Sequence, residues 1–159
     1  MMPALVILVC LIGSAFFSGI ETGMISIHRL KLRSYAEEGF PWAVAMQAIL
    51  DSPSRLLVSL LCGNNLCNII AAVFVASVAN QLAPQWGELV AGVALSLFVL
   101  IFCEYIPKAW FRAHPIARSR PFLRPLQVIT TLLSPLVRVV TLLTDWIVRD
   151  PEGRMTRGP

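Results

Sequence analysis

Long apolar runs separated by short polar segments dominate the chain. Three of these runs cover residues 3–27, 56–80 and 86–106. Crossing the ~30 Å hydrocarbon core of a bilayer takes about 20 helical residues, and each run is long enough. The pattern therefore predicts an all-α membrane protein with three transmembrane helices.

The polar segment between the first two runs, residues 29–51, predicts a pair of short surface helices. Glu37, Glu38 and Gly39 are typical of a helix end. Pro41 can open the second helix, because proline is favoured at the first helical position.

Residues 121–149 are apolar enough to suggest a fourth span, but their pattern favours a helix lying in the membrane interface. Apolar residues recur at alternating steps of four and three: Phe122, Leu126, Ile129, Leu133, Leu136, Val140, Leu143 and Ile147. The opposite face is polar, as in an amphipathic interfacial helix. Arg138 at the centre of a span would cost ~2.5–3.5 kcal/mol, and Pro125 and Pro135 would kink it. We expect an interfacial belt helix here, with a fourth span as the alternative.

These segments predict one transmembrane domain over residues 1–149. Residues 150–159 have no apolar period and are expected to form a disordered linker.

Composition and charge support the membrane interpretation. Hydrophobic residues make up 57% of the 159 residues and charged residues 14%, with a mean hydropathy of +0.73. These values exclude an ordinary soluble enzyme. No Lys or Arg precedes Arg29 or lies in the 81–88 loop, so all 13 fall on one side of the three runs. Positive residues mark the cytoplasmic face, which predicts an outside N-terminus and a multi-pass protein of the inner (plasma) membrane.

Other classes of function find little support in the chain. We expect no enzyme, because there is no His cluster, nucleophile–base pair or glycine-rich phosphate loop. The basic residues are assigned to the membrane surface rather than to nucleic acid. Cys10, Cys62, Cys67 and Cys103 lie in apolar runs and are expected to pack as small hydrophobes.

Polar residues inside the runs are the candidate chemistry, since such groups are costly in a bilayer and are often functional. The first run carries Ser14, Ser18, Thr22 and Ser26 on one helical face, with Glu21 beside them; the second carries Gly63, Asn64, Asn65 and Asn68; the third ends near Glu104. Ser18 and Asn65 each lie nine residues inside the inner boundaries at Ile27 and Leu56, or ~13.5 Å deep. The two clusters are therefore predicted to meet at one level.

Hydroxyl, carboxamide and carboxylate oxygens are hard ligands, which suit Mg²⁺, Ca²⁺ or Na⁺. Backbone carbonyls near Gly19 or Gly63 could complete the ligand shell if a helix there is unwound or π-bulged.

Structural alternatives stay open for these polar residues. The hydroxyls of Ser14 and Ser26 are expected to bond to their own helix. The asparagines could join helices by hydrogen bonds. Glu104 could pair with Lys108, and Glu21 could pair near the inner interface.

Several of these segments, taken in order, resemble the transmembrane domain of the CorC/CNNM family of magnesium transporters. They are residues 16–22, 29–32 with 36–39, 54–57, 63–65 with Asn68, 104–108 and 134–136. The resemblance covers residues 4–149. It departs from the family pattern at Cys103, where glycine is frequent, and at Ile20, where serine is usual.

The resemblance implies three spans, a cytoplasmic helix pair, a belt helix and a homodimer in the lipid membrane. It also implies sodium-dependent Mg²⁺ export, with one Mg²⁺ held in each protomer. By matching position, the implied ligands are Ser18, Thr22, Gly63, Asn64, Asn65 and Glu104, with Glu21 and Asn68 as secondary candidates. The paired CBS domains that follow in the family are not in this chain. A non-transporting membrane anchor, and a sodium or proton pathway through Glu21 and Glu104, are the alternative functions.

Overall fold

The computed structural model describes residues 2–135, 137–139 and 142, and over these residues the regular structure is helical throughout. The helices are α1 (Met2–Ile25), α2 (Arg29–Glu37), α3 (Pro41–Leu50), α4 (Pro53–Leu82), α5 (Gly87–Phe98), α6 (Ile106–Ala113), α7 (Pro115–Ser119) and α8 (Leu123–Leu132). A π-helical segment, η1 (Val99–Tyr105), joins α5 to α6, and a 3-10 turn, η2 (Arg120–Phe122), precedes α8. The predicted linker 150–159 and the end of the predicted belt helix lie outside the described residues.

The all-α prediction is confirmed, and three helices are long and apolar enough to cross a membrane. They are Met2–Ile25, Pro53–Leu82 and Gly87–Ala113. The third is longer than predicted, because the helix continues through Pro107 to Ala113 instead of ending at Ile106. Proline has no N–H and crowds the carbonyl four residues earlier. The wider π turn of η1, directly before Pro107, accommodates both effects.

The short surface helices are confirmed as α2 and α3. Gly39 between them adopts φ +85°, a left-handed conformation that glycine reaches without steric cost. Pro41 occupies the start of α3, where its missing N–H leaves no hydrogen bond unmade.

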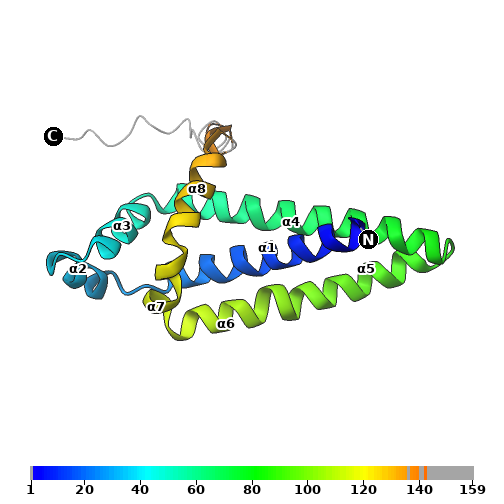
Figure 1. Ribbon diagram of the computed structural model, residues 1–159, viewed down its shortest axis with the longest axis horizontal. Coiled ribbons are helices and arrows are strands. Elements are labelled where there is room, and N and C mark those ends of the chain that lie inside the picture. The colour runs from blue at the N-terminus through cyan, green and yellow to red at the C-terminus, as the bar shows by residue number, and fades with distance from the viewer. Residues whose placement is uncertain (1, 136, 140–141, 143–159) are drawn as a thin grey trace, which may run out of the picture.

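The spans lie side by side, with α1 between α4 and the third span, and the short helices gather at one end (Figure 1). The helix α8 crosses this end of the bundle instead of running beside the spans (Figure 1). Over Leu123–Leu132 the chain is therefore a belt and not a fourth span. We call this end the belt end.

The main hydrophobic core lies at the belt end. It is built from the second half of α1, the start of α4 and the short helices, and it includes Ile20, Met24, Leu32, Met46, Leu56, Leu60, Phe111 and Leu126. The short helices therefore brace the spans at one end, and the polar residues of α1 and α4 lie just beyond this core.

Candidate cation site between the helices

The first two spans pack closely through small residues. A Cβ on Gly63 would lie 2.6 Å from Phe17 Cζ, and one on Gly13 would lie 2.9 Å from Cys67 Sγ. Between these contacts, the buried Ser14 Oγ donates a hydrogen bond of 2.8 Å to Asn64 Oδ1. Ser14 therefore bonds across to α4, and the expectation that it bonds to its own helix is wrong.

These contacts also correct the predicted depth. Asn64 lies level with Ser14, which places it one helical turn from Ser18. The expectation of Ser18 and Asn65 at one level is off by about that turn. Counting from apolar boundaries cannot resolve it, because α1 ends at Ile25, short of the Ile27 boundary, whereas α4 begins at Pro53, beyond the Leu56 boundary.

Ser18 is fully buried, and its hydroxyl has no hydrogen-bond partner. Its neighbour Phe17 contacts α4 at Gly63, and its other neighbour Gly19 contacts α6 at Pro107. Because successive helical residues point ~100° apart, Ser18 faces the wedge between α4 and the third span. Leaving a buried hydroxyl without a hydrogen bond lowers the stability of the fold by about 1–3 kcal/mol. This oxygen is therefore a candidate ligand atom.

The third span contributes Glu104 from the π-helical segment η1. Single π turns inside α-helices are rare and are frequent at functional sites. The N–H of Ile106 bonds to the carbonyl of Ile101, five residues earlier. Pro107 leaves the carbonyl of Cys103 without its α-helical donor. The irregular backbone that was expected near Gly19 or Gly63 therefore lies beside Glu104 instead, since α1 and α4 are unbroken α-helices at those glycines.

Glu104 is half-buried and forms neither a salt bridge nor a side-chain hydrogen bond in the described part of the chain. The alternative pairing with Lys108 is absent. Glu104 and Asn68 line one groove of about 390 Å³ between α4 and the third span. Asn68 Oδ1 is buried and lacks a hydrogen-bond partner. The structure thus brings the secondary candidate Asn68 to the same groove as Glu104.

The other candidates divide between the interior and the surface. Thr22 is half-buried one turn beyond Ser18, and Glu21 is half-buried with no ion pair in the described residues. Gly63 is buried beneath the Phe17 ring. Asn65 is exposed on the outer face of α4, so this chain does not bring it to the others.

Two residues at the belt end were missed by sequence reasoning. The ring of Phe111 lies over both Gly19 and Gly23 of α1. Ser119 is fully buried, and its unpartnered Oγ lies 2.7 Å from where a Cβ of Gly23 would be. The glycine spacing on α1 was the available signal, since it marks a close approach, but nothing in the sequence says that α6 and α7 make it.

Nitrogen and sulfur ligands do not gather in the described part of the chain, where no three His, Cys, Asp or Glu residues come together. The four cysteines are free. A cation bound among these helices would be held by hydroxyl, carboxamide, carboxylate and backbone oxygens, which suit a hard ion.

A bundle of three helices, each long and apolar enough to cross a bilayer, defines a membrane protein. Comparison with known families identifies it further. The cyclin M transmembrane N-terminal domain, abbreviated CNNM, matches residues 5–157. The chain belongs to this family, which is a family of membrane transporters associated with Mg²⁺ transport.

Individual relatives agree with this assignment. The chain is 36% identical to the UPF0053 inner membrane protein YfjD of Escherichia coli over 86% of its length and 32% of the relative. It is 32% identical to a UPF0053 protein of Haemophilus influenzae, over 91% of this chain and 34% of that one. A chloroplastic DUF21 domain-containing protein of Arabidopsis thaliana is 31% identical over 90% of this chain and 22% of its own. The chain spans about a third or less of the length of these relatives.

Proposed function

We propose that this chain is the transmembrane domain of a Mg²⁺ transporter and that it holds one Mg²⁺ between α1, α4 and η1. The observation that carries the proposal is the buried, unpartnered hydroxyl of Ser18 in the wedge beside η1. On the same segment, Glu104 supplies a carboxylate without a cationic partner. A carboxylate inside a bilayer is costly unless its charge is compensated, and a bound divalent cation would supply that compensation.

Each ligand has a distinct role in this proposal. Glu104 provides the charge, and Ser18, with Thr22 one turn beyond it, provides hydroxyl oxygen. Asn64 Oδ1 keeps a second lone pair beside its bond from Ser14, and Asn68 Oδ1 is unpartnered. Mg²⁺ takes six oxygens at ~2.0–2.1 Å and keeps several waters, so protein oxygens need fill only part of the shell.

The proposal extends to sodium-dependent export across the inner (plasma) membrane by a homodimer with its belt end in the cytoplasm. An inside-negative potential opposes export of a divalent ion by ~4.6 kcal/mol per 100 mV, so export needs a coupled driving ion such as Na⁺. The relatives extend well beyond the matched region, which leaves room for the regulatory cytoplasmic region of the CBS type that the family resemblance implies. We assign no enzymatic role and no nucleic-acid partner.

A second function, a non-transporting anchor, is favoured by one observation. The bond between Ser14 and Asn64 joins two spans inside the interface, as expected of a helix-packing contact. In an anchor, Ser18, Asn68 and Glu104 would have no ligand to bind, and Mg²⁺ would not stabilise the domain.

Calorimetry on the purified chain separates the two functions. We expect saturable Mg²⁺ binding in the wild type and at least a tenfold loss of affinity in Glu104→Gln, because the only carboxylate in the proposed ligand set becomes neutral. Glu88→Gln is the matched control, since Glu88 is exposed in the first turn of α5 at the opposite end of the bundle. Absence of binding in a folded wild type, or equal binding in both variants, would refute the proposed site. Titration with Na⁺ alone tests whether the coupling ion uses the same ligands.

A further inference from the structure

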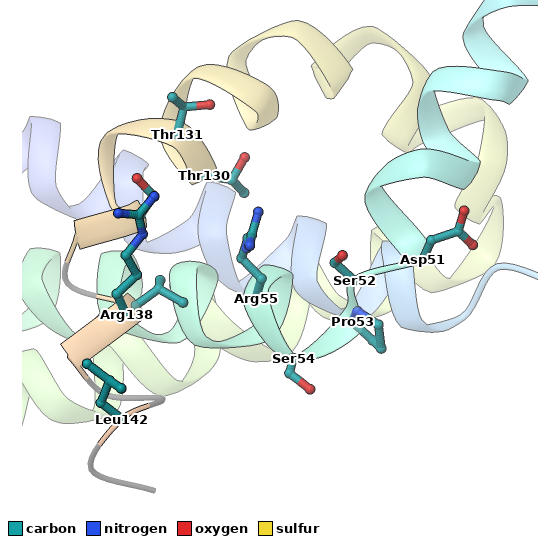
Figure 2. Close-up of a pocket in the computed structure, with 11 residues that line it drawn as sticks. Asp51, Ser52, Pro53, Ser54, Arg55, Thr130, Thr131, Arg138 and Leu142 are labelled. Carbon is teal, nitrogen blue, oxygen red and sulfur yellow. The ribbon is translucent and has the colours of Figure 1, made fainter. Parts of the chain in front are cut away.

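A second cavity, separate from the cation site, lies at the belt end between α4 and α8. Its volume is about 790 Å³, and its walls come from the α3–α4 loop, the first residues of α4, the end of α8 and the residues after it. Figure 2 shows Arg55 rising from α4 toward Thr130, and Arg138 extending toward Thr131 on the same side of the gap. Two guanidinium groups from distant parts of the sequence therefore line one space.

Neither guanidinium is neutralised within the described part of the chain. Arg55 and Arg138 form no salt bridge there, and their side chains donate no hydrogen bond to protein. Asp51 lines the far side of the cavity and is the one carboxylate among the described residues of its wall (Figure 2). The wall carries more positive than negative charge, so the space favours an anion.

The start of α4 adds donors to the wall beside the two arginines. Ser52 precedes α4, and its side chain makes no capping hydrogen bond. The first intrahelical bond there comes from the N–H of Leu56 to the carbonyl of Ser52, so the N–H groups of Ser54 and Arg55 have no partner within the helix. The hydroxyls of Thr130 and Thr131 are already committed to the carbonyl of Gln127. Donors from α4 thus face the same space as the two arginines.

The cavity lies at the height where a bilayer has its headgroups. Arg55 is in the first turn of a span-length helix, and α8 crosses the bundle at that level (Figure 1). An amphipathic helix at this position rests at the boundary between headgroups and acyl chains. The anions concentrated at that boundary are lipid phosphates.

We propose that this cavity binds a phosphate group, held by Arg55 from α4 and Arg138 from the segment after α8. Guanidinium groups bind phosphate oxygens through paired, charge-assisted hydrogen bonds. The phosphate comes from the headgroup of an anionic phospholipid or from free phosphate. One bound phosphate would tie the belt to the second span, the helix that carries Asn64 and Asn68. This inference is independent of Mg²⁺ binding.

Native mass spectrometry of the detergent-purified full chain, with added phosphatidylglycerol, tests the proposal. We expect Arg55→Gln and Arg138→Gln each to weaken phosphatidylglycerol binding about tenfold, the usual size of a lost charged hydrogen bond. Arg124→Gln is the matched control and is expected to bind like the wild type, since Arg124 is exposed on α8 outside the cavity. Phosphatidylcholine, which carries no net charge, is expected to bind more weakly than phosphatidylglycerol.

A parallel thermal-unfolding titration with inorganic phosphate identifies the source. A midpoint raised by phosphate in the wild type, but not in the Arg55→Gln/Arg138→Gln double variant, would assign the cavity to free phosphate. A response to lipid alone would assign it to the headgroup. Wild-type binding of both probes in the double variant, or an equal loss in Arg124→Gln, would overturn the proposal. Unfolding curves without ligand confirm that each variant is folded.

Discussion

The first two spans and the third span differ in how far the rest of the chain covers them. Inside the bundle, 28% of the apolar window is buried in α1 and in α4, against 11% in the third span. The third span is itself divided, because α5 has no buried residue while η1 and α6 pack against α1. The molecule is thus a tight α1–α4 pair. The third span packs against α1 through η1 and α6 and against α4 through α5, whose residues stay largely exposed.

The α1–α4 contact and the contact with the third span also differ in whether their buried polar groups have hydrogen-bond partners. Between α1 and α4, Ser14 and Asn64 satisfy each other. Elsewhere among the described residues, Ser18 Oγ and Asn68 Oδ1 are buried without hydrogen-bond partners, and Glu104 forms no salt bridge. An interface built only for stability satisfies its buried polar groups. The unpartnered oxygen atoms are therefore what distinguishes the proposed ion site from the satisfied Ser14–Asn64 contact.

The largest expected difference between the two regions comes from shortening a leucine in each. Leu60→Ala should lower the free energy of unfolding by about 2–5 kcal/mol, since Leu60 is fully buried and its loss leaves a cavity. Leu97→Ala on α5 should cost less than about 0.5 kcal/mol, because Leu97 is 55% exposed. Denaturant unfolding in detergent measures both. Similar losses would show that α5 is covered in the folded protein as fully as α4.

A smaller difference is expected from adding volume at glycine. Gly63→Val should destabilise the protein by about 1–3 kcal/mol, because the new side chain meets the Phe17 ring, 2.6 Å from the Cβ position. Gly92→Val is the control on α5, where no atom lies within 4 Å of the Cβ position. The thermal-unfolding midpoints of the two variants measure the difference. A neutral Gly63→Val would mean that α1 and α4 separate more readily than their contact indicates.

The smallest difference is expected between two adjacent asparagines. Asn64→Ala removes the acceptor of the Ser14 hydroxyl, a loss of ~0.6 kcal/mol on average for such bonds in membranes. Asn65→Ala should leave stability unchanged, since Asn65 is exposed. Urea or SDS titration of the two variants side by side measures the difference between their free energies of unfolding. A greater loss from Asn65→Ala would indicate that a partner covers the outer face of α4.

Much of the fold could be predicted from sequence, because hydrophobic run length and turn chemistry are local signals. Gly39 and Pro41 fixed the boundary between α2 and α3, and the apolar period after Phe122 indicated the belt. The end of the third span was placed too early, at Ile106. Pro107 reads as a helix end in a sequence, but the π turn before it lets the helix continue to Ala113.

The residue types of the candidate site could be proposed from the sequence, but the relative positions of these residues could not. Ser18 and Glu104 were singled out because hydroxyl and carboxylate groups are unusual in apolar runs. The sequence could not say which of Asn64, Asn65 and Asn68 face inward, because that depends on the rotation of α4 against its neighbours. The irregular backbone likewise lies directly before Pro107 and not at Gly19 or Gly63, where the sequence suggested it.

Ser18 offers the most direct test of the central claim. Removing its hydroxyl abolishes the stabilisation by Mg²⁺ if Ser18 binds the ion, and leaves that stabilisation intact if Ser18 only packs. Without Mg²⁺, Ser18→Ala should be as stable as the wild type or more stable, since it removes a buried unpaired hydroxyl. Ser34→Ala is the control, since Ser34 on α2 is exposed, lies away from the proposed site and has its hydroxyl bonded to Glu38 on its own helix.

The measurement is the thermal-unfolding midpoint of the purified chain with and without saturating Mg²⁺. If Ser18 binds the ion, Mg²⁺ raises the midpoint of the wild type and of Ser34→Ala, as binding to the folded state requires, and leaves that of Ser18→Ala nearly unchanged. An equal rise in all three proteins would contradict a ligand role for Ser18.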